Sequence, residues 1–149
     1  MAMREILFRG KREDNGEWIE GYLVRRPSAI QVGEHYSPWA IDRPPKDPDD
    51  SGEVCFVDGN TVGQFTGLTD KNGRRIWEGD IIKDCDYEHI HSVRYFGDEG
   101  YPAFDCFPEI QFCECNGLSH LSAASAMEVI GNIYDNHELL EVHDVRTEL

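Results

Sequence analysis

Two pairs of side chains in this sequence have the types and the spacing of metal ligands. Cys113 and Cys115 form a Cys-x-Cys pair shortly after Cys106, and His89 and His91 form a His-x-His pair. On a β-strand, residues i and i+2 point to the same side, so each pair could direct two ligands at one ion. Zinc sites usually take four ligands from two such pairs, and each group here supplies only half of that pattern. We therefore interpret the cysteines as core residues and the histidines as a solvated strand end, and predict no metal and no other cofactor.

Motifs for covalent or phosphate chemistry are missing from the sequence. It contains no Gly-x-Ser-x-Gly nucleophile turn and no glycine-rich phosphate loop. The 29 aspartates and glutamates could include a catalytic pair, but the sequence alone does not select one. No catalytic residue is predicted, and an enzyme remains only as the metal-dependent alternative.

The stretch QFTGLTDKNGRRIWEGDII, residues 64–82, crowds charges, a tryptophan and turn residues together as an active site would. Asn72-Gly73 is a tight-turn signal, and Gly79 allows a sharp bend before Asp80, whose carboxylate can accept nearby backbone amides. Trp77 is expected in the core or in a subunit interface. The residues predicted to frame the fold, and not a site, are Gly67, Asn72, Gly73, Trp77, Glu78, Gly79, Asp80, Gly131 and Asn132.

The net charge of −15 is unevenly distributed along the chain. Residues 1–26 carry six basic and five acidic side chains, whereas residues 80–109 carry two basic and eight acidic ones. Nucleic-acid affinity comes largely from lysine and arginine, so this balance excludes a nucleic-acid partner. It indicates an acidic surface and, in a sharper form, an acidic face offered to a basic protein.

The sequence patterns predict mainly short β-strands. Asn15-Gly16 predicts a hairpin across residues 4–25. Residues 37–53 hold four of the seven prolines and four aspartates, which predicts a long loop and a boundary between segments 1–53 and 54–149. Short strand-like runs follow, residues 121–127 are the one helix-compatible patch before the end, and a short C-terminal helix is expected after Asp135.

The chain shows neither membrane nor secretory signals. No run approaches the roughly 20 apolar residues of a membrane helix, and the first residues are too charged for a signal peptide. Five cysteines without a secretory signal indicate reduced thiols in a cytosol.

Three blocks carry a resemblance to a known family. In order they are REILFRGKREDNGEWIEG, QFTGLTDKNGRRIWEGDII and EVIGNIYDNHELL. Together they resemble the YopX-like proteins of phages and prophages. The resemblance implies a mainly β protein with an N-terminal β-rich segment and a C-terminal SH3-like small barrel. It also implies a phage-derived gene expressed in a bacterium and an often self-associating protein, and it brings no catalytic residue.

These observations lead to three hypotheses about function. The first is a phage or prophage accessory protein of the bacterial cytoplasm that acts by protein binding or self-assembly. The second is an acidic decoy that occupies a DNA-binding host protein, because the net charge is −15. The third is a metal-dependent enzyme that uses the cysteine or histidine pairs.

Overall fold

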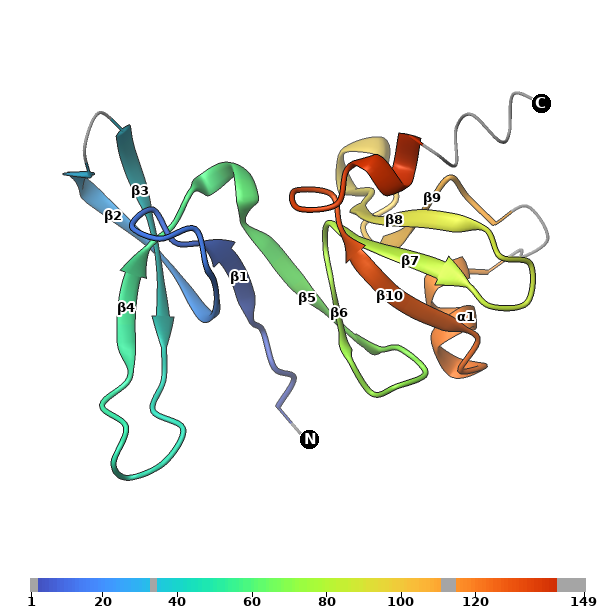
Figure 1. The fold of residues 1–149 in the computed structure, drawn as a ribbon, viewed down its shortest axis with the longest axis horizontal. Coiled ribbons are helices and arrows are strands. Elements are labelled where there is room, and N and C mark those ends of the chain that lie inside the picture. Colours follow the sequence, from blue (N-terminus) through green and yellow to red (C-terminus); the bar gives the residue numbers. More distant parts are fainter. Residues whose placement is uncertain (1–2, 33–34, 111–114, 142–149) are drawn as a thin grey trace. The chain divides into compact units, whose positions relative to one another are not determined.

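The chain is built mainly from antiparallel strands (Figure 1). The computed structural model describes residues 3–32, 35–110 and 115–141, and of residues 27–32, 35 and 36 the backbone alone. Its strands are β1 Phe8–Lys11, β2 Trp18–Val32, β3 His35–Arg43, β4 Glu53–Phe56, β5 Gly63–Thr69, β6 Arg75–Trp77, β7 Asp80–Asp84, β8 Ile90–Tyr95, β9 Phe104–Phe107 and β10 Met127–Asn132. Its helical elements include the 3-10 turns η1 Gly59–Thr61 and η2 Gly97–Glu99 and the helix α1 Gly117–Ala123. The prediction of a mainly β protein is confirmed.

The chain divides into two compact units, Met1–Phe65 and Thr66–Leu149. The division falls inside β5, later in the chain than the boundary that the sequence predicts at residue 53. We call these parts the first unit and the second unit.

The first unit is a sheet whose strands follow the order β4-β3-β2-β1-β5. The predicted hairpin is confirmed, because Phe8 of β1 faces Gly21 of β2 and Lys11 faces Trp18. Gly16 in the connecting turn has φ +73°, a conformation that glycine adopts without the steric cost of a side chain. The sheet packs around a small core of Ile19, Ile41, Cys55 and Val57.

The proline-rich segment is a strand in its first part, so the prediction of a loop over residues 37–53 is wrong there. β3 continues to Arg43, and Trp39, Ala40 and Ile41 pair with β2. Pro38 lies where the β2–β3 register shifts, between the pairs at Arg25 and Ile30, and a bulge is a position where a missing backbone donor is tolerated.

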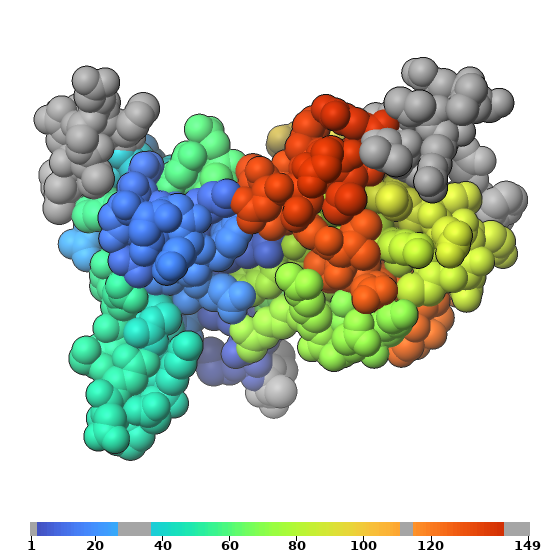
Figure 2. All heavy atoms as spheres, in the orientation of Figure 1, coloured from blue at the N-terminus to red at the C-terminus, as the bar shows by residue number. Residues whose placement is uncertain are grey.

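The remaining loop, residues 44–52, projects beyond the ends of β3 and β4 (Figures 1 and 2). Its base is closed by an ion pair of 2.6 Å between Arg43 Nη1 and Asp50 Oδ2. The Asp50 carboxylate also accepts the backbone N–H groups of Lys46 and Gly52. These bonds and the Arg43 guanidinium hold the pKa of Asp50 well below its usual range.

The second unit contains an antiparallel sheet in the order β10-β7-β8-β9. β5 enters this unit and pairs with β6 there, after pairing with β1 in the first unit. The core of the second unit contains Ile76, Ile82, Val93, Cys106 and Met127 among its buried side chains.

The predicted SH3-like barrel is not confirmed, because neither sheet closes on itself among the described residues. Other segments bond to both outer strands of the second sheet. Lys71 N donates to Met127 O of β10 at 3.0 Å, and the Asn116 side-chain amide donates to Phe104 O of β9 at 2.7 Å. These bonds occupy backbone carbonyl groups of the two outer strands, which would have to pair with each other to close a barrel.

The helix α1 begins earlier than the helix-compatible patch in the sequence. Asn116 caps it by accepting the Ser119 N–H at 2.9 Å, and the helix ends at Ala123 instead of continuing to Met127. Residues 138–141 form the expected short C-terminal helix. No helix among the described residues is long and apolar enough to cross a membrane.

Candidate binding sites

The predicted metal ligands take different places in the second unit. Cys106 is fully buried in the core, and burial raises the pKa of its thiol to about 12. Cys115 is exposed and disulfide-bonded, so the expectation of five reduced thiols is wrong for this residue. Cys113 lies outside the described residues.

The two histidines lie near one another, with ring centroids 6.4 Å apart. His89 is exposed, whereas His91 is buried and its Nδ1 lies 2.6 Å from the carbonyl oxygen of Pro108. A carbonyl only accepts, so Nδ1 carries the proton of this hydrogen bond. Within the described ranges, no three His, Cys, Asp or Glu side chains gather as a metal-binding group.

The stretch from residue 64 to 82 forms a hairpin and the entry into β7. Asp80 is 1% exposed, and its Oδ2 accepts the Trp77 backbone N–H at 2.7 Å. Gly79 before it has φ +89°, and Trp77 is buried. These residues shape the bend between β6 and β7.

Asp70 is the residue of this stretch whose role the sequence did not reveal. It is 6% exposed, and its Oδ1 accepts the backbone N–H groups of Asn72 and Arg74, both at 2.9 Å. Its Oδ2 accepts the N–H of Val129 in β10 at 3.0 Å. Desolvation raises the pKa of Asp70, but these three hydrogen bonds outweigh it, so the pKa lies below its usual value. The carboxylate thus attaches the β5–β6 turn to β10.

The other framing residues lie in turns or within strands β5 and β10. Gly67 and Gly73 have positive φ angles, and Glu78 is half-buried between β6 and β7. Gly131 follows the register shift in β10, and a side chain there would collide with Asn136, since an added Cβ would lie 2.5 Å from its Oδ1. Asn132 accepts the backbone N–H groups of the next turn at Tyr134 and Asp135.

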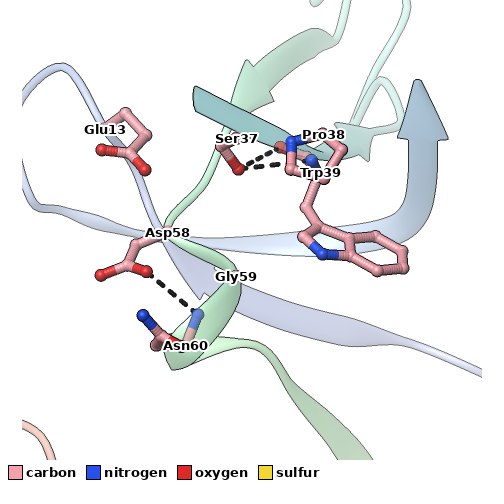
Figure 3. A pocket seen from close by; sticks show the side chains of 7 residues that line it. All are labelled: Glu13, Ser37, Pro38, Trp39, Asp58, Gly59 and Asn60. Atoms are coloured by element: carbon pink, nitrogen blue, oxygen red, sulfur yellow. Dashed lines mark hydrogen bonds between the residues drawn. The ribbon is translucent and has the colours of Figure 1, made fainter. Parts of the chain in front are cut away.

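A cavity of about 520 Å³ lies in the first unit. Three separate segments build it: the start of the β1–β2 turn, the first half of β3 and the turn that contains η1. Figure 3 shows the carboxylates of the cavity on one side of the η1 turn and the indole ring on the other. The lining residues are Glu13, Ser37, Pro38, Trp39, Asp58, Gly59 and Asn60.

Backbone contacts hold the walls of this cavity in place. Glu13 N donates to Phe56 O at 3.0 Å, which fixes the turn against the end of β4. The buried Ser37 hydroxyl donates to Val57 O. Asp58 caps η1 by accepting the Asn60 N–H at 3.0 Å. The arrangement is rigid at its polar groups, as a binding pocket requires.

The second candidate is the surface formed by Arg94 and Phe107, which we call the aromatic surface. Val93 and Cys106 pair across β8 and β9 and face the core, so Arg94 and Phe107 point to the other side of the sheet. The Arg94 guanidinium lies 3.7 Å from the Phe107 ring centroid. Phe107 is 42% exposed, which leaves its aromatic ring open to a partner.

The sequence did not identify either site. Glu13, Trp39 and Asp58 are far apart in the chain, and only the β3–β4 pairing and the bridge between Arg12 and Val57 bring their segments together. The one local signal was the Asp58-Gly59-Asn60 turn. The aromatic surface had no comparable local signal, because burial along β8 and β9 does not alternate.

The fold and these sites define a class: a two-unit, mainly antiparallel β protein with surfaces suited to binding. The chain belongs to the YopX family, since the family model described as "YopX protein" matches residues 7–141. The resemblance stated from the three sequence blocks is confirmed.

One similar solved structure is the crystal structure of protein EF1440 from Enterococcus faecalis. It is 24% identical, with a TM-score of 0.50, and the match covers 93% of this chain and 99% of that one. At this identity the likeness shows the fold alone. No curated protein matches the chain.

Proposed function

We propose that this chain is a phage-derived accessory protein of the bacterial cytoplasm that binds a basic protein partner and catalyses no reaction. The observation that carries the proposal is the aromatic surface, with Arg94 stacked on the exposed ring of Phe107. Arginine and exposed aromatic side chains are the residue types that most often dominate binding energy in protein interfaces.

The charge of the chain segment that holds this surface supports a basic partner. Asp98 and Glu99 of η2 and Asp105 of β9 belong to the segment 80–109, which carries eight acidic and two basic side chains. A symmetric contact between two copies would place these like-charged surfaces against each other, which costs association free energy. A basic partner instead gains from the attraction.

The test is capture of binding proteins from a bacterial host with three tagged chains: the wild type, Phe107→Ser and Tyr87→Ser. Tyr87 is the matched control, because it is also an exposed aromatic residue, at 69%, but lies outside the aromatic surface. A basic protein retained by Tyr87→Ser, and bound about thirtyfold more weakly by Phe107→Ser, supports the proposal, since removing a central aromatic costs about 2 kcal/mol or more.

Two further measurements define the partner. Binding that is competed by DNA and weakened by salt identifies the decoy form of the function, in which the partner is a DNA-binding protein. Light scattering over micromolar concentrations tests self-assembly. If both variants capture the same proteins equally, the aromatic surface is not the binding site and the proposal is wrong.

A further inference from the structure

The cavity of the first unit has the chemistry of a site for a positively charged group. Glu13 and Asp58 are both half-buried at its wall. Within the described part of the chain, neither carboxylate forms an ion pair with a lysine, arginine or histidine. The Asp58 carboxylate accepts the backbone N–H of Asn60, and among the described residues no other hydrogen bond joins a charged side chain to another lining residue. Two carboxylates beside a cavity and without a counter-ion favour a cationic occupant.

The neighbouring Arg12 is already engaged with other acids. Arg12 lies 2.7 Å from Asp14 and 3.0 Å from Glu53. The carboxylate of Asp14, and not that of Glu13, thus pairs with the adjacent guanidinium. The two cavity carboxylates therefore keep their negative charge for a ligand.

Trp39 adds a flat aromatic surface to the cavity. Gly59 makes room for its ring, because a Cβ at this position would lie 2.6 Å from Trp39 Cδ1. The Arg25 guanidinium, opposite Trp39 in the β2–β3 register, lies 5.7 Å from the ring centroid, although Arg25 is not among the cavity-lining residues. The Trp39 ring is thus shaped and placed to stack with a guanidinium.

From these observations we infer that the cavity binds an arginine side chain of an extended segment of a partner protein. Arginine fits better than lysine, because a planar guanidinium can stack on the Trp39 ring or form two hydrogen bonds with one carboxylate, whereas a lysine ammonium acts as a point charge. The volume of about 520 Å³ falls within the range of about 300–1,000 Å³ that is usual for ligand sites. It also exceeds one side chain, which leaves space for the residues on either side of the arginine.

This inference does not depend on the proposed function. The cavity is in the first unit and the aromatic surface is in the second, and different residues carry each argument. Failure of the capture experiment leaves the cavity site standing, and failure of the experiment below leaves the aromatic surface standing.

The test is a titration of the full chain with the blocked peptide acetyl-Gly-Ser-Arg-Ser-Gly-amide, followed by the NMR signal of the Trp39 indole N–H. The Trp39→Phe variant assigns that signal. Stacked and charged contacts of this kind predict a Kd on the order of 1 mM. The same peptide with neutral citrulline in place of arginine should bind at least about tenfold more weakly, and the lysine peptide about threefold more weakly.

Variants of the cavity locate the site. Asp58→Asn keeps the oxygen that accepts the Asn60 N–H, so the fold is retained while the charge is lost. Asp58→Asn and Glu13→Gln should each weaken the arginine peptide about fivefold. The double variant Asp49→Asn/Glu99→Gln is the control, because it neutralises two exposed carboxylates outside the cavity and should change Kd by less than about twofold. Arg25→Gln should tighten binding about twofold, because it removes a competing positive charge.

The inference is wrong if the citrulline peptide binds as tightly as the arginine peptide, or if the control double variant weakens binding as much as the cavity variants. It is also wrong if guanidinium chloride moves the Trp39 signal with the same Kd as the peptide, since the cavity would then recognise a small cation and not a side chain within a chain. A lysine peptide that binds more tightly than the arginine peptide overturns the choice of arginine.

Discussion

Replacement of Asp70 by asparagine should destabilise the second unit far more than its single-atom change suggests. The carboxylate accepts three backbone N–H groups, two through Oδ1 and that of Val129 through Oδ2. If the asparagine oxygen keeps the first two bonds, its NH₂ group faces the buried N–H of Val129, and two donors oppose each other. The loss of one charged hydrogen bond and an unsatisfied buried donor should cost about 2–3 kcal/mol of unfolding free energy.

The assay is unfolding by guanidinium chloride, with hydrogen exchange of the Val129 amide as a local readout. Asp70→Ala should cost about 3–5 kcal/mol, because all three donors lose their acceptor. Asp47→Asn is the matched control. Its Oδ1 accepts the backbone N–H groups of Asp49 and Asp50 in the same kind of turn, but it is exposed, so its cost should stay below about 0.5 kcal/mol.

The loss of unfolding free energy caused by Asp70→Asn should also depend on pH. The hydrogen bonds to the carboxylate determine whether this loss grows or shrinks in acid. The folded pKa of Asp70 lies below the usual 3.8, so the unfolded chain takes up its proton first as the pH falls. The stabilisation by the carboxylate is therefore complete above this value and is lost as the pH falls through the folded pKa. Equal costs for Asp70→Asn and Asp47→Asn, or a cost that does not decrease in acid, would refute the reasoning.

Two further experiments follow from the structure, one with glycine substitutions and one with labelling of thiols. Gly79→Ala should cost about 1–2 kcal/mol from its φ of +89° alone, and more than Gly16→Ala, because an added Cβ lies 3.2 Å from the Tyr134 ring at Gly79 and meets nothing within 4 Å at Gly16. Equal costs in thermal or denaturant unfolding would show that the contact with Tyr134 relaxes freely. Cys106, buried and with a thiol pKa raised to about 12, should resist iodoacetamide at pH 8 in the folded protein, while the half-buried Cys85 is labelled. Mass spectrometry that finds Cys106 modified first would contradict its burial.

The sequence predicted the turns and hairpins, because these depend on residues that are neighbours in the chain. Asn15-Gly16 gave the first hairpin, because a two-residue turn signal fixes the strands on either side. The turn at Asn72 was equally visible. The contact between Asp70 and Val129 was not, because the two residues are far apart in the chain and meet only where the β5–β6 turn bonds to β10.

The wrong prediction of a loop where β3 lies has a different cause. Prolines and aspartates dominate residues 37–53, and their composition outweighed the apolar run Trp39 to Ile41. The structure places Pro38 at an irregularity of the pairing, where its lack of an N–H group does no harm. The cavity could not be predicted for a related reason, since Glu13 and Asp58 are far apart in the chain and the bridge between Arg12 and Val57 brings their segments together.

The ion pair between Arg43 and Asp50 has a practical consequence for protein engineering. The ion pair closes the base of loop 44–52. A change in the length of the loop beyond this pair should therefore leave the pairing of β3 with β4 intact. A fluorescent tag or affinity epitope inserted between Asp47 and Asp49 would extend a segment that already projects from the first unit (Figure 2). The loop is therefore a position for labelling this protein that leaves both the cavity and the aromatic surface chemically unaltered.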